Sequence, residues 1–161
     1  LHDKNLNLSS FNYIRLRDIP YSVYKETIKQ RLKVEKYTGK IIIDYPYNKD
    51  WHDRFHGIHY NSSNIENFNN NERDDNCIYS ASCHTENDIN ECNLRLFDFI
   101  LLSPLLEKHN KFNALGWSKF NKLSLKSYSP TIALGGLSSN GYDYNDCIEH
   151  SGFGIAGIRK I

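Results

Sequence analysis

The sequence predicts an α/β fold and, within that class, a (β/α)8 barrel. Seven short apolar runs recur along the 161 residues, and several are apolar on both faces, as parallel strands buried on two sides are. Segments with helical periodicity lie between many of these runs, and alternating strands and helices are typical of an α/β domain. Because each run ends at polar or glycine residues where a loop can begin, a barrel is favoured over an open doubly wound sheet.

The predicted strands cover seven short ranges. In chain order they are residues 13–17, 41–44, 57–60, 78–82, 99–103, 131–135 and 154–158. A complete barrel has one strand more, and an unpaired edge in a buried parallel sheet is costly. We therefore expect residues 1–161 to form a single barrel domain whose first strand and helix are absent from this sequence.

Helices are predicted where apolar residues repeat every three or four positions. The predicted segments are residues 24–32, 85–96, 117–123 and 144–148. Thr85 and Asp88 have the spacing of a capping box at the start of the second segment. Gly39 and Gly152 are plausible terminators after the first and last segments.

Composition narrows the class of partner. The formal net charge is +1, so there is no basic field of the kind that binds nucleic acid or an anionic membrane. No run approaches the roughly 18 apolar residues that a spanning helix needs. The four cysteines form no C-x-x-C pair, which indicates reduced, packed thiols in a cytoplasmic protein. A small, specific ligand is the better prediction.

Polar side chains and glycines stand where the predicted strands end. Chemistry in such a barrel lies at the carboxyl ends of the strands. The set is Arg17, Asp44, His59, Ser82, His84, Ser103, Gly135, Gly136, Ile158 and Arg159. No glycine-rich nucleotide-binding motif follows any strand. The strand ends therefore predict a site for a phosphorylated ligand.

A zinc site is the alternative offered by His52, His56 and His59. On one helix their spacing would bring the imidazoles together. Gly57 and the strand-like residues after it interrupt such a helix, so we expect His52 and His56 to be surface residues.

Six segments resemble thiamine phosphate synthase and its relatives, including the thiazole tautomerases. The segments are IRLRD (14–18), GIHY (57–60), SCHT (82–85), FDFILLSP (97–104), ALGGL (133–137) and GIAGI (154–158), in the order found in that family. The resemblance implies a transferase in thiamine biosynthesis that joins hydroxymethylpyrimidine diphosphate to thiazole phosphate and releases pyrophosphate with Mg²⁺. It further implies phosphorylated pyrimidine and thiazole partners and is compatible with a homodimer.

The resemblance also assigns roles to residues at the strand ends. Arg17, Ser82 and Lys111 are expected to hold the diphosphate, where a forked and permanently charged guanidinium suits two bridged phosphates. His59 completes the catalytic group, and its position opposite Ile58 points it into the barrel mouth. An ion pair of Arg17 with Asp18 or Asp44, and a core role for His59, are the structural alternatives.

The acceptor phosphate and the metal are assigned in the same way. Backbone N–H groups at Gly135 and Gly136, with Ile158 and Arg159, are expected to bind the thiazole phosphate. A tight turn that needs positive φ accounts for the glycines equally well. Asp44 and His84 are further expected substrate contacts.

The metal site departs from the family pattern. Asp44 and Asn64 stand where the family has its magnesium ligands, and Asn64 brings no charge. Two other activities therefore remain open. One is a thiazole phosphate tautomerase that uses His59 or His84, although the nearest histidine to the expected catalytic position is His109. The other is a relative that binds a phosphorylated thiazole or thiamine phosphate without catalysis.

Overall fold

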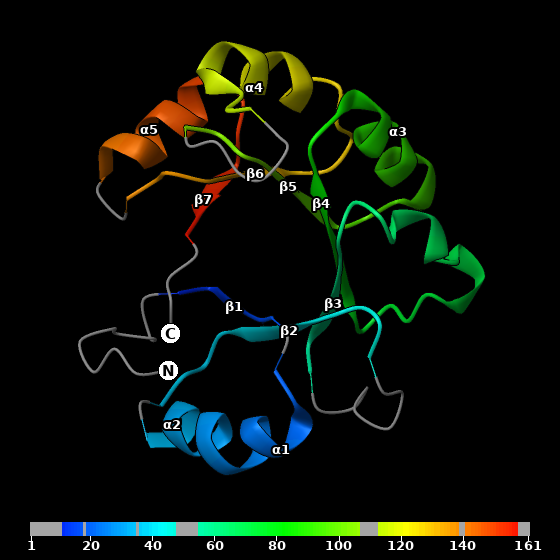
Figure 1. The fold of residues 1–161 in the computed structure, drawn as a ribbon, viewed down its shortest axis with the longest axis vertical. Coiled ribbons are helices and arrows are strands. Elements are labelled where there is room, and N and C mark those ends of the chain that lie inside the picture. Colours follow the sequence, from blue (N-terminus) through cyan, green and yellow to red (C-terminus); the bar gives the residue numbers. More distant parts are fainter. Residues whose placement is uncertain are drawn as a thin grey trace.

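A curved sheet of seven parallel strands forms the centre of the molecule in a computed structural model, which describes residues 11–17, 19–34, 36–47, 55–106, 113–138 and 141–157. The strands lie side by side in chain order (Figure 1). They are β1 (Tyr13–Leu16), β2 (Lys40–Asp44), β3 (Gly57–Tyr60), β4 (Ile78–Cys83), β5 (Phe99–Leu102), β6 (Thr131–Leu134) and β7 (Gly154–Ala156). All seven strands predicted from the sequence are present, with ends that differ by at most two residues.

Helices cover the outer side of this sheet, as Figure 1 shows. A continuous helical segment follows β1 and consists of α1 (Tyr21–Val23), a π-helical turn η2 (Tyr24–Ile28) and α2 (Lys29–Val34). The helices α3 (Glu86–Arg95), α4 (Gly116–Ser124) and α5 (Gly141–Glu149) follow β4, β5 and β6. Two short 3-10 helices, η4 (Ile65–Asn67) and η5 (Asn70–Glu72), make the connection from β3 to β4. None of the helices in the described residues has the length and apolar content needed to span a bilayer.

The sheet is not a closed eight-stranded barrel. β1 and β7 are its two edges, and within the described ranges no further strand pairs with either of them. Figure 1 shows the two edges facing each other across the open side of the curve. The structure is therefore a seven-stranded parallel half-barrel. This agrees with the α/β class and the seven predicted strands, whereas a closed eight-stranded barrel is not present in the described residues. Alternating strands and helices predict a parallel sheet, but they do not say whether its two edges meet.

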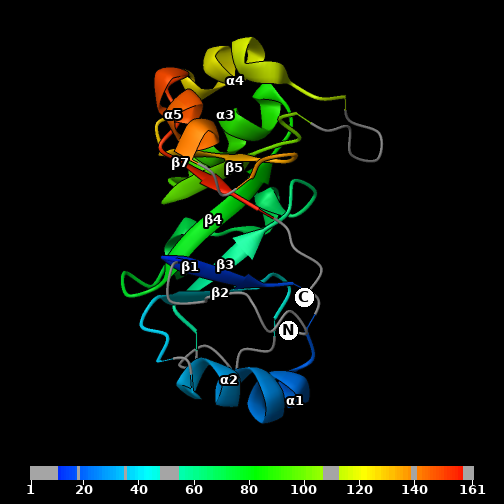
Figure 2. The same ribbon diagram turned by 90° about the vertical axis from the view of Figure 1, so that its left-hand side faces the viewer.

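The hydrophobic core lies between the sheet and its helices, in two clusters. The larger cluster packs β3–β6 against α3, α4 and α5, with Ile89, Ile100 and Phe120 wholly buried. The smaller cluster packs β1 and β2 against the helical segment after β1, through residues such as Ile14 and Ile28. Figure 2 shows these two groups of helices at opposite ends of the molecule. Each large apolar side chain buried in this way contributes about 1.5–3 kcal/mol.

Local contacts explain where α3 starts. The Thr85 hydroxyl accepts a hydrogen bond from the Asp88 N–H (3.2 Å), and the Asp88 carboxylate accepts one from the Thr85 N–H (2.9 Å). The capping box predicted from the sequence is confirmed. The same carboxylate accepts a hydrogen bond from the His84 N–H (2.8 Å), so it also fixes the end of β4.

Candidate functional site

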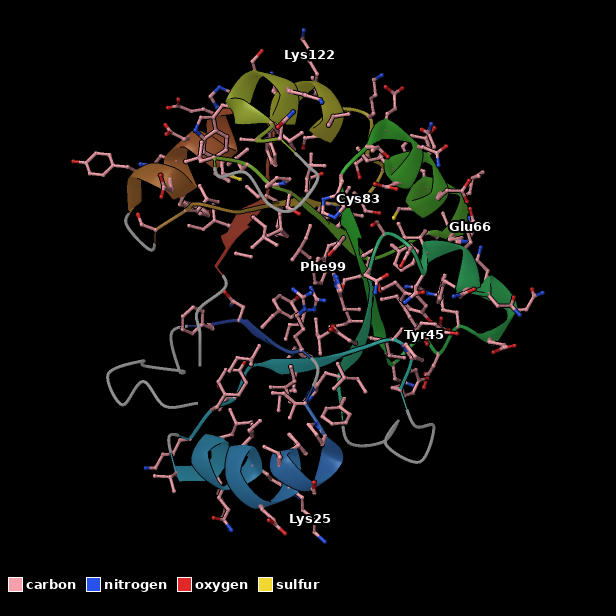
Figure 3. All side chains as sticks on the ribbon, in the orientation of Figure 1. Lys25, Tyr45, Glu66, Cys83, Phe99 and Lys122 are labelled. Atoms are coloured by element: carbon pink, nitrogen blue, oxygen red, sulfur yellow. The ribbon has the colours of Figure 1, made fainter. Side chains whose placement is uncertain are left out.

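Side-chain alternation gives the sheet an apolar outer face and a partly polar inner face. On β3, Ile58 and Tyr60 belong to the core beneath the helices, so His59 between them faces the inner side. Phe99 also faces the inner side, as Figure 3 shows. Its ring meets that of Tyr13 from β1, with the two ring centroids 5.5 Å apart. Because β1 and β5 are not neighbours in the sheet, this contact crosses the space that the sheet encloses.

His59 is a deeply buried polar side chain on the inner face. Its Nδ1 lies 2.9 Å from Ser80 Oγ, and its Nε2 lies 2.8 Å from Ser82 Oγ. Burial holds the pKa of His59 well below its usual range, and the positive charges of Arg15 and Arg17 lower it further. The ring is therefore neutral, with one donor and one acceptor nitrogen, so one serine accepts and the other donates.

Arg15 and Asp44 form an ion pair on the same face. The Arg15 Nε–H donates to Asp44 Oδ1 at 2.6 Å, and the two side chains are 24% and 21% exposed. The sequence analysis considered Asp44 as a partner of Arg17, whereas the pairing that the structure shows is with Arg15. Arg17 follows β1, and its charge acts on His59.

Strand register explains why these groups converge. Asp44 on β2 is the partner of His59 on β3, and His59 is the partner of Ser80 on β4. The three side chains thus form a row across adjacent strands, and Ser82 lies two residues farther along β4. The row lies close to the carboxyl ends of β2 and β3, where chemistry is expected in this class of fold.

Two residues of this site, Arg15 and Ser80, were missed by the sequence analysis. The signal that could have found them is the two-residue period of a strand, which places Arg15 on the face of Arg17 and Ser80 on the face of Ser82. The structure thus brings together three predicted site residues and these two additional ones. The five are Arg15, Asp44, His59, Ser80 and Ser82.

His84 connects the ends of β4 and β5. Its Nδ1 lies 2.7 Å from the Ser103 carbonyl oxygen, so this nitrogen carries the proton and donates. The Ser103 hydroxyl is 3.4 Å from the same nitrogen. These contacts place His84 between the ends of β4 and β5, and its expected contact with substrate stays a prediction.

Gly135 and Gly136 form the turn after β6. Their φ angles are +112° and +73°, in the region that favours glycine. A Cβ on Gly135 would lie 3.1 Å from the Leu105 nitrogen, so the turn packs closely on the segment after β5. Close by, the Ser138 N–H and hydroxyl both donate to the Asp143 carboxylate, at 2.6 and 2.9 Å. The positive φ angles agree with the tight-turn alternative, and the anion nest at Gly135 and Gly136 stays a prediction.

The two residues predicted as magnesium ligands, Asp44 and Asn64, make other contacts in the structure. Asp44 Oδ1 is bound to Arg15, and Asn64 lies in the loop after β3, where its N–H donates to the Asn61 carbonyl. Within the described parts of the chain, no three His, Cys, Asp or Glu side chains are grouped so that they could hold a metal ion. Because Mg²⁺ is usually bound by one or two carboxylates together with substrate phosphates, a magnesium site at Asp44 and Asn64 stays a prediction.

Two of the three histidines considered for zinc, His56 and His59, make hydrogen bonds to other groups. His56 Nδ1 accepts a hydrogen bond from the Ile41 N–H (3.1 Å), and both ring nitrogens of His59 face serines. Six of the predicted or considered residues lie outside the described ranges. They are Asp18, His52, His109, Lys111, Ile158 and Arg159.

Comparison with known proteins supports the fold. No protein-family model and no curated protein sequence matches this chain. Its structure is similar to thiamine phosphate pyrophosphorylase from Pyrococcus furiosus, with a TM-score of 0.67 and 15% identity over 94% of this chain and 74% of that one. FabK from Thermotoga maritima is also similar, with a TM-score of 0.68 and 9% identity. That match covers 87% of this chain and 47% of the FabK chain. The native KDPGal structure has a TM-score of 0.65 and 14% identity to this chain, and the match covers 95% of this chain and 73% of that one.

At these low identities the likeness shows the fold alone. The chain has a parallel α/β half-barrel of the kind found in barrel enzymes, among them a thiamine phosphate pyrophosphorylase.

Proposed function

We propose that this chain is a transferase of thiamine biosynthesis, which joins hydroxymethylpyrimidine diphosphate to thiazole phosphate. The observation that carries the proposal is the inner face at Arg15, Arg17, His59 and Ser82, where two guanidinium groups act on a buried neutral imidazole. Such a face suits an anion with several oxygens, because guanidinium forks and hydroxyls donate to phosphate. The similar fold of the Pyrococcus enzyme supports the same reaction class.

The reaction breaks the bond between the pyrimidine methylene carbon and the diphosphate oxygen. The electron pair leaves with pyrophosphate, and the thiazole nitrogen supplies the pair for the new carbon–nitrogen bond. In this proposal Arg17 and Ser82 donate to the diphosphate and stabilise the negative charge as it develops. His59 remains neutral, so it adds no positive charge beside the carbon that becomes electron-poor.

The remaining predicted contacts stay part of the proposal. Gly135, Gly136, Ile158 and Arg159 are assigned to the acceptor phosphate, and Lys111 to the diphosphate. Most of the rate enhancement in this scheme comes from holding two substrates in line and stabilising the leaving group, so no strong general base is required.

A direct assay tests the proposal. The purified chain is incubated with both substrates at several magnesium concentrations, and thiamine phosphate is measured by chromatography. We expect thiamine phosphate to form, and we expect Arg17→Ala to weaken pyrophosphate binding strongly while thiazole phosphate binding stays nearly unchanged. Arg95→Lys, at an ion pair with Glu91 on α3, is the control and should behave like the parent chain.

Other results would point to other functions. No thiamine phosphate at any magnesium level, with retained thiazole phosphate binding, contradicts the transferase. Isomerisation of the thiazole phosphate without joining would support the tautomerase. Equal loss of both ligands in Arg17→Ala would indicate a structural role for Arg17.

A further inference from the structure

Arg15 uses one edge of its guanidinium and leaves the other edge available. Its Nε–H donates to Asp44 Oδ1 at 2.6 Å. The two outer nitrogens, Nη1 and Nη2, make no hydrogen bond within the part of the chain that the structure describes. A guanidinium can bind one anion beside Nε and a second across Nη1 and Nη2, where the spacing of its N–H groups matches two phosphate oxygens.

The position of Arg15 suits a ligand on the inner face. Its side chain is 24% exposed, so part of it is accessible to a ligand. Its charge acts on His59, as does that of Arg17, and His59 is hydrogen-bonded to Ser82. Two guanidiniums and one carboxylate therefore lie around this part of the site, and the sum of these three charges is positive.

We propose that Arg15 is a second diphosphate-binding residue and that Asp44 is a positioning residue, which holds Arg15 Nε so that Nη1 and Nη2 face the ligand. This assignment rests on the proposed function and deepens it. It replaces the predicted role of Asp44 as a magnesium ligand, because the Asp44 carboxylate is already paired with Arg15 through Oδ1.

The three roles open to Asp44 predict different effects of removing its charge. If Asp44 is a positioning residue, Asp44→Asn weakens pyrophosphate binding in the absence of any metal. If Asp44 is a magnesium ligand, the same substitution weakens pyrophosphate binding only when magnesium is present. If Asp44 is only a negative charge near an anion site, its removal strengthens pyrophosphate binding. The direction of the change in pyrophosphate affinity, and whether that change needs magnesium, therefore distinguish the three roles.

The experiment is a calorimetric titration with inorganic pyrophosphate in EDTA, on the parent chain, Asp44→Asn, Arg15→Lys and the double variant. We expect each single variant to bind about tenfold more weakly, the usual effect of losing one hydrogen bond to a charged group. The double variant should bind little worse than either single one, because both changes remove the same interaction. Arg95→Lys, which alters an ion pair on the outer helix α3, should bind as the parent does.

Several outcomes overturn the inference. They are unchanged affinity in Arg15→Lys, tighter binding in Asp44→Asn, a loss in Asp44→Asn that appears only with magnesium, and no pyrophosphate binding by the parent chain. Circular dichroism and urea midpoints show whether the variants are folded, and Arg15→Lys decides alone if Asp44→Asn does not fold. Pyrophosphate binding needs no thiazole, so Arg15-dependent binding without thiamine phosphate formation would contradict the proposed transferase and leave this inference intact.

Discussion

His59 shows how single residues set the chemistry of the inner face. A histidine of ordinary pKa would be partly protonated near neutral pH, whereas burial and two arginines keep this one neutral. Ser80 and Ser82 supply a partner for each ring nitrogen, so the imidazole is buried without an unsatisfied polar atom. The ring therefore orients the Ser82 hydroxyl without contributing a charge.

The low pKa of His59 predicts how stability depends on pH. Below about pH 6.5 the unfolded chain takes up a proton at this residue, while the folded chain does not until a lower pH. The free energy of unfolding should therefore fall on acidification below pH 6.5, by at most about 1.4 kcal/mol per pH unit from this group. Urea unfolding of the parent chain and of His59→Gln between about pH 5 and pH 7 isolates the contribution of His59, as the difference in the slope of unfolding free energy against pH.

NMR gives an independent check of the same prediction. The His59 ring resonances should stay constant over this pH range. A titration of His59 with an ordinary midpoint, or equal pH slopes for the two proteins, would show that the buried ring is not kept neutral.

At the scale of elements, the spacing of β3 and β4 depends on Gly57. A Cβ at this position would lie 2.6 Å from the Ile78 carbonyl oxygen and 2.9 Å from the Ile78 Cβ. Gly57 and Ile78 are direct partners in the parallel pair that carries His59, Ser80 and Ser82. The absence of a side chain thus lets the two strands that carry the histidine and the serines approach closely.

We expect Gly57→Ala to destabilise the fold by about 1–3 kcal/mol, the usual range for overpacking. Urea denaturation measures the change, and the pyrophosphate affinity should fall with it because the two strands must separate. Gly154→Ala is the matched control on β7, where the nearest atom to a new Cβ is Ile132 Cδ1 at 3.4 Å. Equal stability of the Gly57 and Gly154 variants would contradict this account of the strand spacing.

The sequence predicts elements better than it predicts contacts. Apolar runs and their polar ends locate all seven strands, and Thr85 with Asp88 locates the start of α3. The pairing of Asp44 with Arg15 could not be derived in this way, since the two residues are 29 positions apart and meet only through the strand register. The period of a strand places Arg15 and Arg17 on one face, but it does not say which of them reaches a carboxylate on the next strand.

At the scale of the whole molecule, the sheet has the seven strands expected from the sequence and is open between β1 and β7. The seven strands and their outer helices place the polar row at the carboxyl ends of β2 and β3 without requiring that β1 and β7 meet. The arrangement of the proposed phosphate-binding residues on the inner face therefore depends on the register of β1–β4, which carry most of these residues.

The most direct test of the central claim is to map pyrophosphate binding by amide chemical shifts. If the inner face binds the diphosphate, the largest shifts should occur at Arg15, Arg17, His59 and Ser82, and the exposed lysines of the α4 region should shift little. Shifts concentrated at Lys119, Lys122 and Lys126, with none on β1, β3 and β4, would contradict the claim that the inner face is the site.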